Sequence, residues 1–327
     1  MNDNNIHESS EMIQQALQGD IRCQMLLGYN YLCPEDDVEP NYEEAIKYFK
    51  MATSMGVAEA EYQTAECLQE IKPNNLPEIF EWYLKAANHG FERAYYDVAL
   101  SYANGYGTKQ NFSEAFSWAQ KGCECKDARS TELMGEFYEY GVGIEKDYSK
   151  AFEYYLKADT LGAYYAPYQL YRCYAYGIGV EKSVSASIEY ALKGAKNHHP
   201  DACMAVGYAY QTGEGLAKDV SKAIEFYRQA IENKIENIAD VYKNMALCYE
   251  ELHDLENMSS CFLKAYELGD MRAGYSLAIS YANGEGIDVD VEKAISILKI
   301  CCGQEDDSNL KVVAEKALAQ IMSNRGN

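Results

Sequence analysis

The chain has 327 residues and a formal net charge of −22, from 29 lysines and arginines against 51 aspartates and glutamates. This excess of acid argues against nucleic acid and anionic membrane surfaces as partners, because both are bound through cations. Residues 1–10 lack the basic start and apolar run of a secretory signal, and no segment reaches the roughly 18 consecutive apolar residues of a membrane helix, so we expect a cytoplasmic protein.

The acidity has two interpretations. It keeps a large exposed surface soluble, or it attracts a basic partner by long-range electrostatics. At the N-terminus, residues 1–19 are expected to form a tail and a short capping helix over residues 11–17.

From residue 20 to residue 303 the sequence repeats with a period near 36. Four Gly-x-Gly pairs follow one another at that step and a fifth comes 71 residues later: Gly105/Gly107, Gly141/Gly143, Gly177/Gly179, Gly213/Gly215 and Gly284/Gly286. A fixed period of this length is typical of a solenoid, in which one supersecondary unit is stacked many times. We count about eight units, three of which lack the glycines.

Each unit is predicted to contain two helices. Ala94, Val98 and Tyr102 have the i, i+4, i+8 spacing of one helical face, which defines helix A. The glycine pair ends helix A, because glycine accepts the left-handed conformation of a C-terminal cap. Helix B follows with Asn or Asp as its N-cap, at Asn41, Asn111, Asp147, Asp219 and Asp290. Strand patterns are absent, so we predict an all-α fold.

Small residues beside the large residue of helix A, such as Gly28, Gly135 and Gly207, are expected to let helix B approach closely. Tyr171 occupies this position in the fifth unit, so the packing there should be looser or shifted. The first, second and seventh units lose the glycine turn, and their loops should be irregular. Residues 304–327 are predicted to form a C-terminal capping helix over 310–322 and a tail.

The fourth unit carries the most complete set of repeated positions. It reads Met134-Gly135-x-x-Tyr138, Gly141-Val142-Gly143-Ile144, Asp147, Lys150-Ala151, Tyr154-Tyr155, Lys157-Ala158 and Gly162. This pattern resembles the Sel-1-like repeat family, which is related to the tetratricopeptide repeats. The resemblance covers residues 20–303 and implies a right-handed α/α superhelical solenoid.

The resemblance also implies a function. Such proteins act mainly as non-catalytic scaffolds and adaptors, so the expected partner is a protein or peptide, with a basic segment among the candidates. The alternative is a small-molecule-binding or β-lactam-hydrolysing protein, as in a cysteine-rich branch with one disulfide in each repeat.

By analogy with tetratricopeptide arrays, helix A lines the concave groove. The positions two before and two after its large residue would face a partner, and Tyr recurs there, as it does at binding hot spots. The resulting groove candidates are Tyr29, Tyr62, Tyr96, Glu132, Tyr168, Arg172, Met204, Tyr208 and Tyr275. These tyrosines could instead pack between repeats, and Arg172 could meet a peptide carboxylate or pair with Glu136.

Neither metal nor cofactor binding is predicted. The eleven cysteines fall at scattered phases of the repeat and are expected to be free thiols. Cys123-x-Cys125 and Cys301-Cys302 have neither a second pair nor His ligands. The His-Glu-x-x-His, Gly-x-Ser-x-Gly and Walker motifs are missing, and five glycine pairs at one period are better explained by turns than by phosphate binding, so no catalytic residue is expected.

Overall fold

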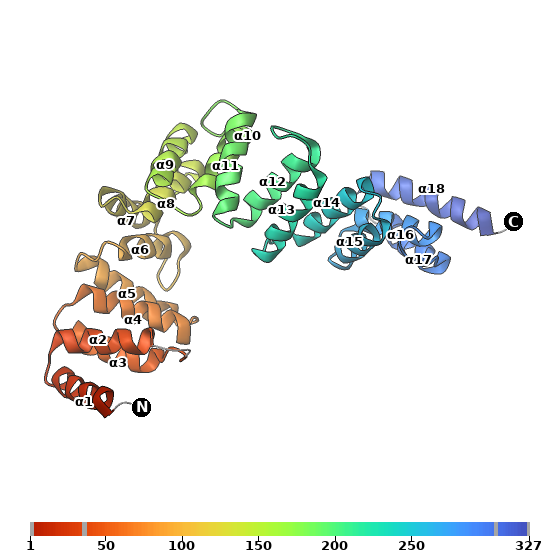
Figure 1. Cartoon of the computed structure of the whole chain (residues 1–327). Helices are drawn as coiled ribbons and strands as arrows, with labels where there is room; N and C mark the ends of the chain where they lie inside the picture. The colour runs from red at the N-terminus through yellow and green to blue at the C-terminus, as the bar shows by residue number, and fades with distance from the viewer. Residues whose placement is uncertain (1–2, 35–37, 304–306, 326–327) are drawn as a thin grey trace. The chain divides into compact units, whose positions relative to one another are not determined.

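The computed structural model describes residues 3–34, 38–303 and 307–325, which form eighteen α-helices and no strand (Figure 1). The predicted all-α fold is confirmed. The acidic run at 35–37 and the expected boundary at residue 304 lie outside the described residues.

The helices between the terminal ones form eight consecutive A and B pairs. The order is α1 (Asp3–Leu17), then the pairs α2 (Ile21–Leu32) with α3 (Tyr42–Thr53), α4 (Ala58–Ile71) with α5 (Leu76–Asn88), α6 (Ala94–Asn104) with α7 (Phe112–Glu124), α8 (Ala128–Tyr140) with α9 (Tyr148–Thr160), α10 (Ala166–Tyr176) with α11 (Val184–Lys196), α12 (Pro200–Thr212) with α13 (Val220–Glu232), α14 (Ile238–Glu251) with α15 (Leu255–Glu267) and α16 (Met271–Asn283) with α17 (Val291–Cys302), and finally α18 (Ser308–Arg325).

The chain divides into two compact units, Met1–Ala163 with α1–α9 and Tyr164–Asn327 with α10–α18. Within each unit every A helix packs against its own B helix, and each B helix packs against the next A helix. Successive A helices also contact each other directly, α6 with α8 in unit 1 and α10 with α12 and α12 with α14 in unit 2. The right-handed sense of the superhelix stays a prediction.

The glycine pairs are turns at the ends of A helices, as predicted. The first glycine of all five pairs is a left-handed C-cap, with φ between 73° at Gly284 and 82° at Gly213. The second glycine is also left-handed, and in four of the pairs it packs on the preceding repeat, at Gly107, Gly143, Gly215 and Gly286. A β-carbon on Gly143, for example, would overlap the backbone of Phe112 at the start of α7. The pair therefore ends a helix and joins two repeats.

The predicted N-caps of the B helices are confirmed. The side chains of Asn41, Asn111, Asp147, Asp219 and Asp290 each accept a hydrogen bond from the backbone N–H three residues later. Each bond satisfies an N–H group that the first helical turn leaves without a partner.

The repeats that lack the glycine pair still form both helices. In the seventh, α14 ends at Glu251 with Leu252 as its C-cap, and His253 takes the left-handed conformation with φ of 57°. Asp254 then caps α15 by accepting from the Asn257 N–H. A single left-handed residue thus replaces the longer turn.

The terminal helices cover the ends of the repeats. α1 is longer than predicted and starts at Asp3; its buried Ala16 packs with Cys23 and Leu27 of α2. α18 packs against α16 and α17, with Leu310 and Ala314 buried in the same core cluster as Leu298. In the described part of the chain no helix combines the length and the apolar character needed to cross a membrane.

Candidate functional site

In unit 1 the aromatic rings of the A helices are in contact with other side chains of the same unit. Tyr62 of α4 is 2% exposed and lies beside Tyr83 and Phe91, with the Arg93 guanidinium 5.3 Å from its ring centroid. Its ring therefore offers little surface to a partner. Tyr96 of α6 is half-buried, and the Arg129 guanidinium lies 4.6 Å from its ring centroid. Such cation–π contacts contribute roughly 0.5–1 kcal/mol at exposed sites.

Two carboxylates on these helices, the half-buried Asp97 and the buried Glu132, have incomplete pairing. Asp97 Oδ1 lies 3.6 Å from Arg129 Nη1, and its Oδ2 has no hydrogen-bond partner among the described residues. Burial raises the pKa of Asp97 to about 7, although Arg129 opposes the shift. Glu132 of α8 is 7% exposed, its Oε1 also has no hydrogen-bond partner there, and burial together with the charge of Glu136 raises its pKa to about 8.

The first repeat places Tyr29 at the edge of unit 1. The Tyr29 hydroxyl donates a hydrogen bond of 2.7 Å to Glu59 Oε1, and its ring meets Phe49 edge-on at a centroid distance of 5.3 Å. Tyr29 is half-buried, so part of its ring remains accessible beside an acidic side chain. The A helices of unit 1 thus combine tyrosines with carboxylates. Arginines of the same unit, Arg93 and Arg129, already cover the rings of Tyr62 and Tyr96.

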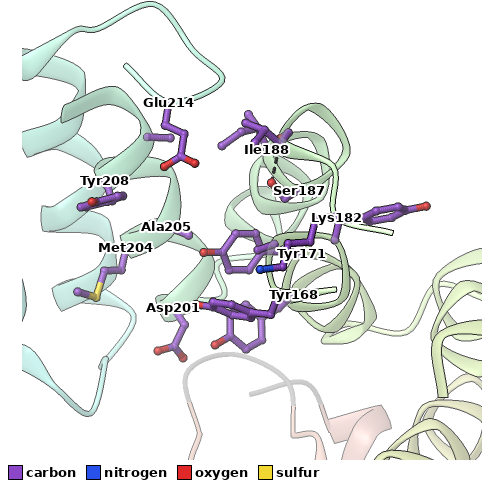
Figure 2. A pocket seen from close by; sticks show the side chains of 15 residues that line it. Tyr168, Tyr171, Lys182, Ser187, Ile188, Asp201, Met204, Ala205, Tyr208 and Glu214 are labelled. Atoms are coloured by element: carbon purple, nitrogen blue, oxygen red, sulfur yellow. Dashed lines mark hydrogen bonds between the residues drawn. The ribbon is translucent and has the colours of Figure 1, made fainter. Parts of the chain in front are cut away.

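Unit 2 differs, because its A helices border an open cavity of about 630 Å³ between α10 and α12 (Figure 2). Three of the predicted groove residues line it: Tyr168, Met204 and Tyr208. They are joined by aromatic, aliphatic and charged side chains that the sequence analysis did not assign to a site, chiefly Tyr171, Tyr174, Ile188, Lys182, Asp201 and Glu214. We call this space the tyrosine cavity.

The tyrosine cavity lies where the repeat exchanges a small residue for a large one. In the fourth and sixth repeats Gly135 and Gly207 of helix A lie against the rings of Tyr155 and Tyr227 from helix B. In the fifth repeat helix A carries Tyr171 and helix B carries the buried Ala191 at the matching position. Figure 2 shows Tyr171 extending from α10 into the space beside α12. The ring of Tyr171 therefore lines the cavity, and the looser or shifted packing expected there stays a prediction.

Tyr168 is held from behind by a histidine. The rings of Tyr168 and His199 stack at a centroid distance of 4.1 Å, and Tyr171 lies 5.9 Å from Tyr168. His199 is the N-cap residue of α12, is 7% exposed, and its Nδ1 has no hydrogen-bond partner among the described residues. Burial lowers its pKa, opposed by Asp201, whose Oδ2 lies 3.9 Å from Nδ1.

The two remaining candidates in unit 2 lie outside the cavity. Arg172 Nη1 donates a hydrogen bond of 2.6 Å to Gln169 on the same helix. Tyr275 of α16 is half-buried and packs against the core cluster of unit 2. One sequence signal could have pointed to the remaining cavity residues. It is Tyr171, which stands where the other repeats have glycine or alanine and which lines the same cavity.

Comparison with known families agrees with the helical pairs. The sequence profile of the Sel1 repeat matches seven segments, at residues 21–57, 58–91, 92–127, 128–159, 163–199, 200–234 and 272–300. Together they make up more than two thirds of the chain. The chain belongs to the Sel1 repeat family. The seventh helical pair, α14 with α15, lies between the last two matched segments and keeps the architecture without a profile match.

Solved Sel1 repeat structures share this fold. The chain is similar to c5321, a protective antigen of uropathogenic Escherichia coli that displays an SLR fold, with 25% identity over 97% of this chain and 67% of that one, and a TM-score of 0.81. A Sel1 repeat protein from Oxalobacter formigenes has 23% identity, with 95% and 89% of the two chains covered and a TM-score of 0.62.

A more distant likeness reaches the tetratricopeptide repeats. It is a signal transduction ATPase with a tetratricopeptide repeat sensor from Pyrococcus horikoshii, with 16% identity, 94% of this chain and 50% of that one covered, and a TM-score of 0.54. No curated protein shows a significant sequence match to the chain. Sel1 repeats generally form non-enzymatic scaffolds for protein interaction.

The cysteines of this Sel1 repeat protein, all of which lie among the described residues, form no disulfide, and seven of the eleven are buried. Burial raises the pKa of Cys67 to about 12 and that of Cys123 to about 11, so these thiols stay protonated at neutral pH. Their scattered positions on the repeats fit core packing rather than a regular disulfide in each repeat.

Proposed function

We propose that this Sel1 repeat protein is a non-catalytic scaffold or adaptor that binds a protein or peptide segment in a concave groove lined by its A helices. The observation that carries the proposal is the tyrosine cavity. It is open, and it is bordered by the A helices α10 and α12 together with the start of α11. Its lining includes Tyr168, Met204 and Tyr208, which repeat position alone assigns to the groove. Pockets of this volume, with many apolar and aromatic residues and a few polar groups, are typical of binding sites.

The packing of each unit supports a groove on the A side. Three pairs of successive A helices, α6 with α8, α10 with α12 and α12 with α14, contact each other, and any contact between successive B helices in the described residues is weaker. A layer whose elements crowd together lies on the inner side of a curved stack, and solenoids use such extended concave surfaces for binding.

The chemistry of the A helices supports a segment that carries positive charge. Desolvation raises the pKa values of the half-buried Asp97 and the buried Glu132, so a cation placed beside them would stabilise their ionised forms. The net charge of −22 adds a long-range attraction for a basic partner. Tyr29, Tyr96 and Tyr208 keep part of their rings accessible, and tyrosine combines large contact area with a polar tip.

Affinity capture from the source cells tests this proposal. The intact protein should retain a partner identifiable by mass spectrometry, and the triple variant Tyr96→Ala, Tyr168→Ala, Tyr208→Ala should lose it while keeping its helical circular dichroism. Loss of the three rings is expected to weaken capture by at least about tenfold, because hot-spot truncations each cost roughly 2 kcal/mol.

The matched control replaces two exposed tyrosines outside the A helices, Tyr106 and Tyr148, which are 50% and 46% exposed. This double variant should capture the partner as the intact protein does. Equal capture by the triple variant and the intact protein would place binding elsewhere and refute a groove on the A helices.

A further inference from the structure

We propose that the tyrosine cavity between α10 and α12 is a pocket for the positively charged side chain of an arginine or lysine in the bound segment. This inference rests on the proposed function and names the chemistry that one part of the groove would recognise.

The walls are suited to the stem and head of a long cationic side chain. Tyr168, Tyr171 and Tyr208 line the space with aromatic rings, and Met204 is a polarizable lining side chain. Aromatic faces attract cations, with arginine favoured, and the methylene stem of such a side chain packs on apolar surface. Tyr168 is fixed in place, because its second face is covered by the stacked His199 ring at 4.1 Å.

The charged groups at the cavity favour a cation. Asp201 and Glu214 approach it from α12 and the turn that follows, whereas Lys182 approaches from the loop between α10 and α11 (Figure 2). Two carboxylates against one ammonium leave a local excess of one negative charge. Asp201 and Glu214 are both exposed, so they sit at the opening, where the head of an incoming side chain arrives.

The cavity is also large enough for more than one group. At about 630 Å³ it lies in the middle of the range of ligand pockets, roughly 300–1,000 Å³, so it can take a long side chain together with the residues beside it. In the fifth repeat the large residue, Tyr171, is on helix A and the small one, Ala191, is on helix B, whereas the next repeat has Gly207 on helix A and Tyr227 on helix B. The exchange places an aromatic ring at the opening of the cavity. Among the eight repeats only the fifth carries a large residue at this position of helix A, so the ring of Tyr171 at the opening is a feature of that repeat.

The test uses the full chain and a displayed library of random 12-residue peptides. Enriched peptides are synthesised with a fluorescent label, and Kd is measured by fluorescence polarisation. We expect a recurring arginine or lysine whose replacement, by citrulline or acetyl-lysine, raises Kd about tenfold, the size of a desolvated cation–π contact. Tyr208→Ala should raise Kd by a similar factor, and in that variant the peptide replacement should have little further effect.

Charge variants give the sign of the interaction. Asp201→Asn and Glu214→Gln should each raise Kd a few-fold, and Lys182→Met should lower it. Glu225→Gln, an equal change of charge at an exposed position of α13, is the matched control and should leave Kd unchanged. Tyr208 is 50% exposed, so Tyr208→Ala should fold, and its urea midpoint provides the check.

The outcomes separate the two proposals. Enriched peptides that bind the cavity without a required cation, or that bind more weakly to Lys182→Met, would overturn the cation pocket and leave the peptide groove standing. Cationic peptides indifferent to Tyr208→Ala, Asp201→Asn and Glu214→Gln would show that the cation binds elsewhere, which also overturns it. Failure to enrich any peptide would count against the proposed function and would remove the basis of this inference with it.

Discussion

The fifth and sixth repeats, which lie in the same unit, place the large and the small residue of the contact between helix A and helix B on opposite helices. In the sixth, Gly207 of α12 lies against the ring of Tyr227, which is fully buried and donates a hydrogen bond of 2.6 Å from its hydroxyl to Gln211 Oε1. In the fifth, the ring belongs to helix A as Tyr171, and Ala191 stands on helix B. Each pair of helices thus combines one aromatic ring with one small residue at these two positions. Of the two rings, Tyr171 of the fifth repeat lines the tyrosine cavity, whereas Tyr227 of the sixth is buried between its own helices.

This difference shows how a repeat protein changes its surface without changing its framework. The turns and caps around both pairs are alike, with Gly177 and Gly213 as left-handed C-caps and Ser183 and Asp219 as N-caps. Because those local features fix the helices, one exchange of side-chain sizes can alter the face between two repeats and leave the fold intact.

The largest expected effect separates the structural ring from the cavity ring. Tyr227→Ala should lower the free energy of unfolding by about 3–5 kcal/mol, because it leaves a buried void. Tyr171→Ala should lower it by about 1–2 kcal/mol, because that ring is half-buried and borders an existing cavity. Urea unfolding followed by circular dichroism measures both, and equal losses would contradict the distinction between the two repeats.

A smaller effect is expected from adding one carbon to the sixth repeat. In Gly207→Ala the new β-carbon would lie 2.7 Å from Cδ1 and Cε1 of Tyr227, so the ring must shift. We expect a net loss of about 1–2 kcal/mol, since overpacking costs about 1–3 kcal/mol and the better helix propensity of alanine returns up to about 1 kcal/mol.

The control for this change is the double variant Gly207→Ala, Tyr227→Leu. Its loss should be smaller than the sum of the two single losses, because leucine removes the ring that the β-carbon would meet. Strict additivity in urea unfolding would show that Gly207 is not needed for the close approach of Tyr227.

The smallest expected effect concerns the junction between the two repeats and depends on pH. Burial lowers the pKa of His199, so the folded state binds fewer protons than the unfolded state between that lowered pKa and 6.5. Its contribution to stability is therefore complete above pH 6.5 and is lost as the pH falls through this window. Urea unfolding at a series of pH values should show the loss.

His199→Asn supplies the comparison for that measurement, since asparagine can serve as an N-cap and does not titrate. The variant should have a flatter stability profile below pH 6.5 than the intact protein. If the two profiles coincide, protonation of His199 has no consequence for the fold.

Much of the fold was predictable because it depends on neighbours in the sequence. The glycine pairs, the N-caps and the i, i+4 spacing each act within about one helical turn, so the pattern around Gly141 or Asp147 indicates local structure directly. The lengths of the terminal helices were harder to predict. α1 begins at Asp3, eight residues before the predicted start at Glu11, because residues 3–10 contain no glycine or proline that would end a helix.

The candidate site was predictable in part. Repeat position placed Tyr168, Met204 and Tyr208 on one face, and all three line the tyrosine cavity. The same positions gave Tyr62 and Glu132, which are buried among side chains of unit 1. Tyr62 is covered by Phe91 and Arg93, which come from the segment before α6 that the repeat pattern does not place.

By itself, then, the sequence determined a chain of two-helix units with glycine turns and capped B helices, since those choices are made by short-range sterics and hydrogen bonds. Only the tertiary structure decided which tyrosines are enclosed and which border open space. A ring such as Tyr171 can turn toward its own partner helix or toward the next repeat. The outcome depends on the size of Ala191 and the position of α12, which are contacts between residues far apart in the chain.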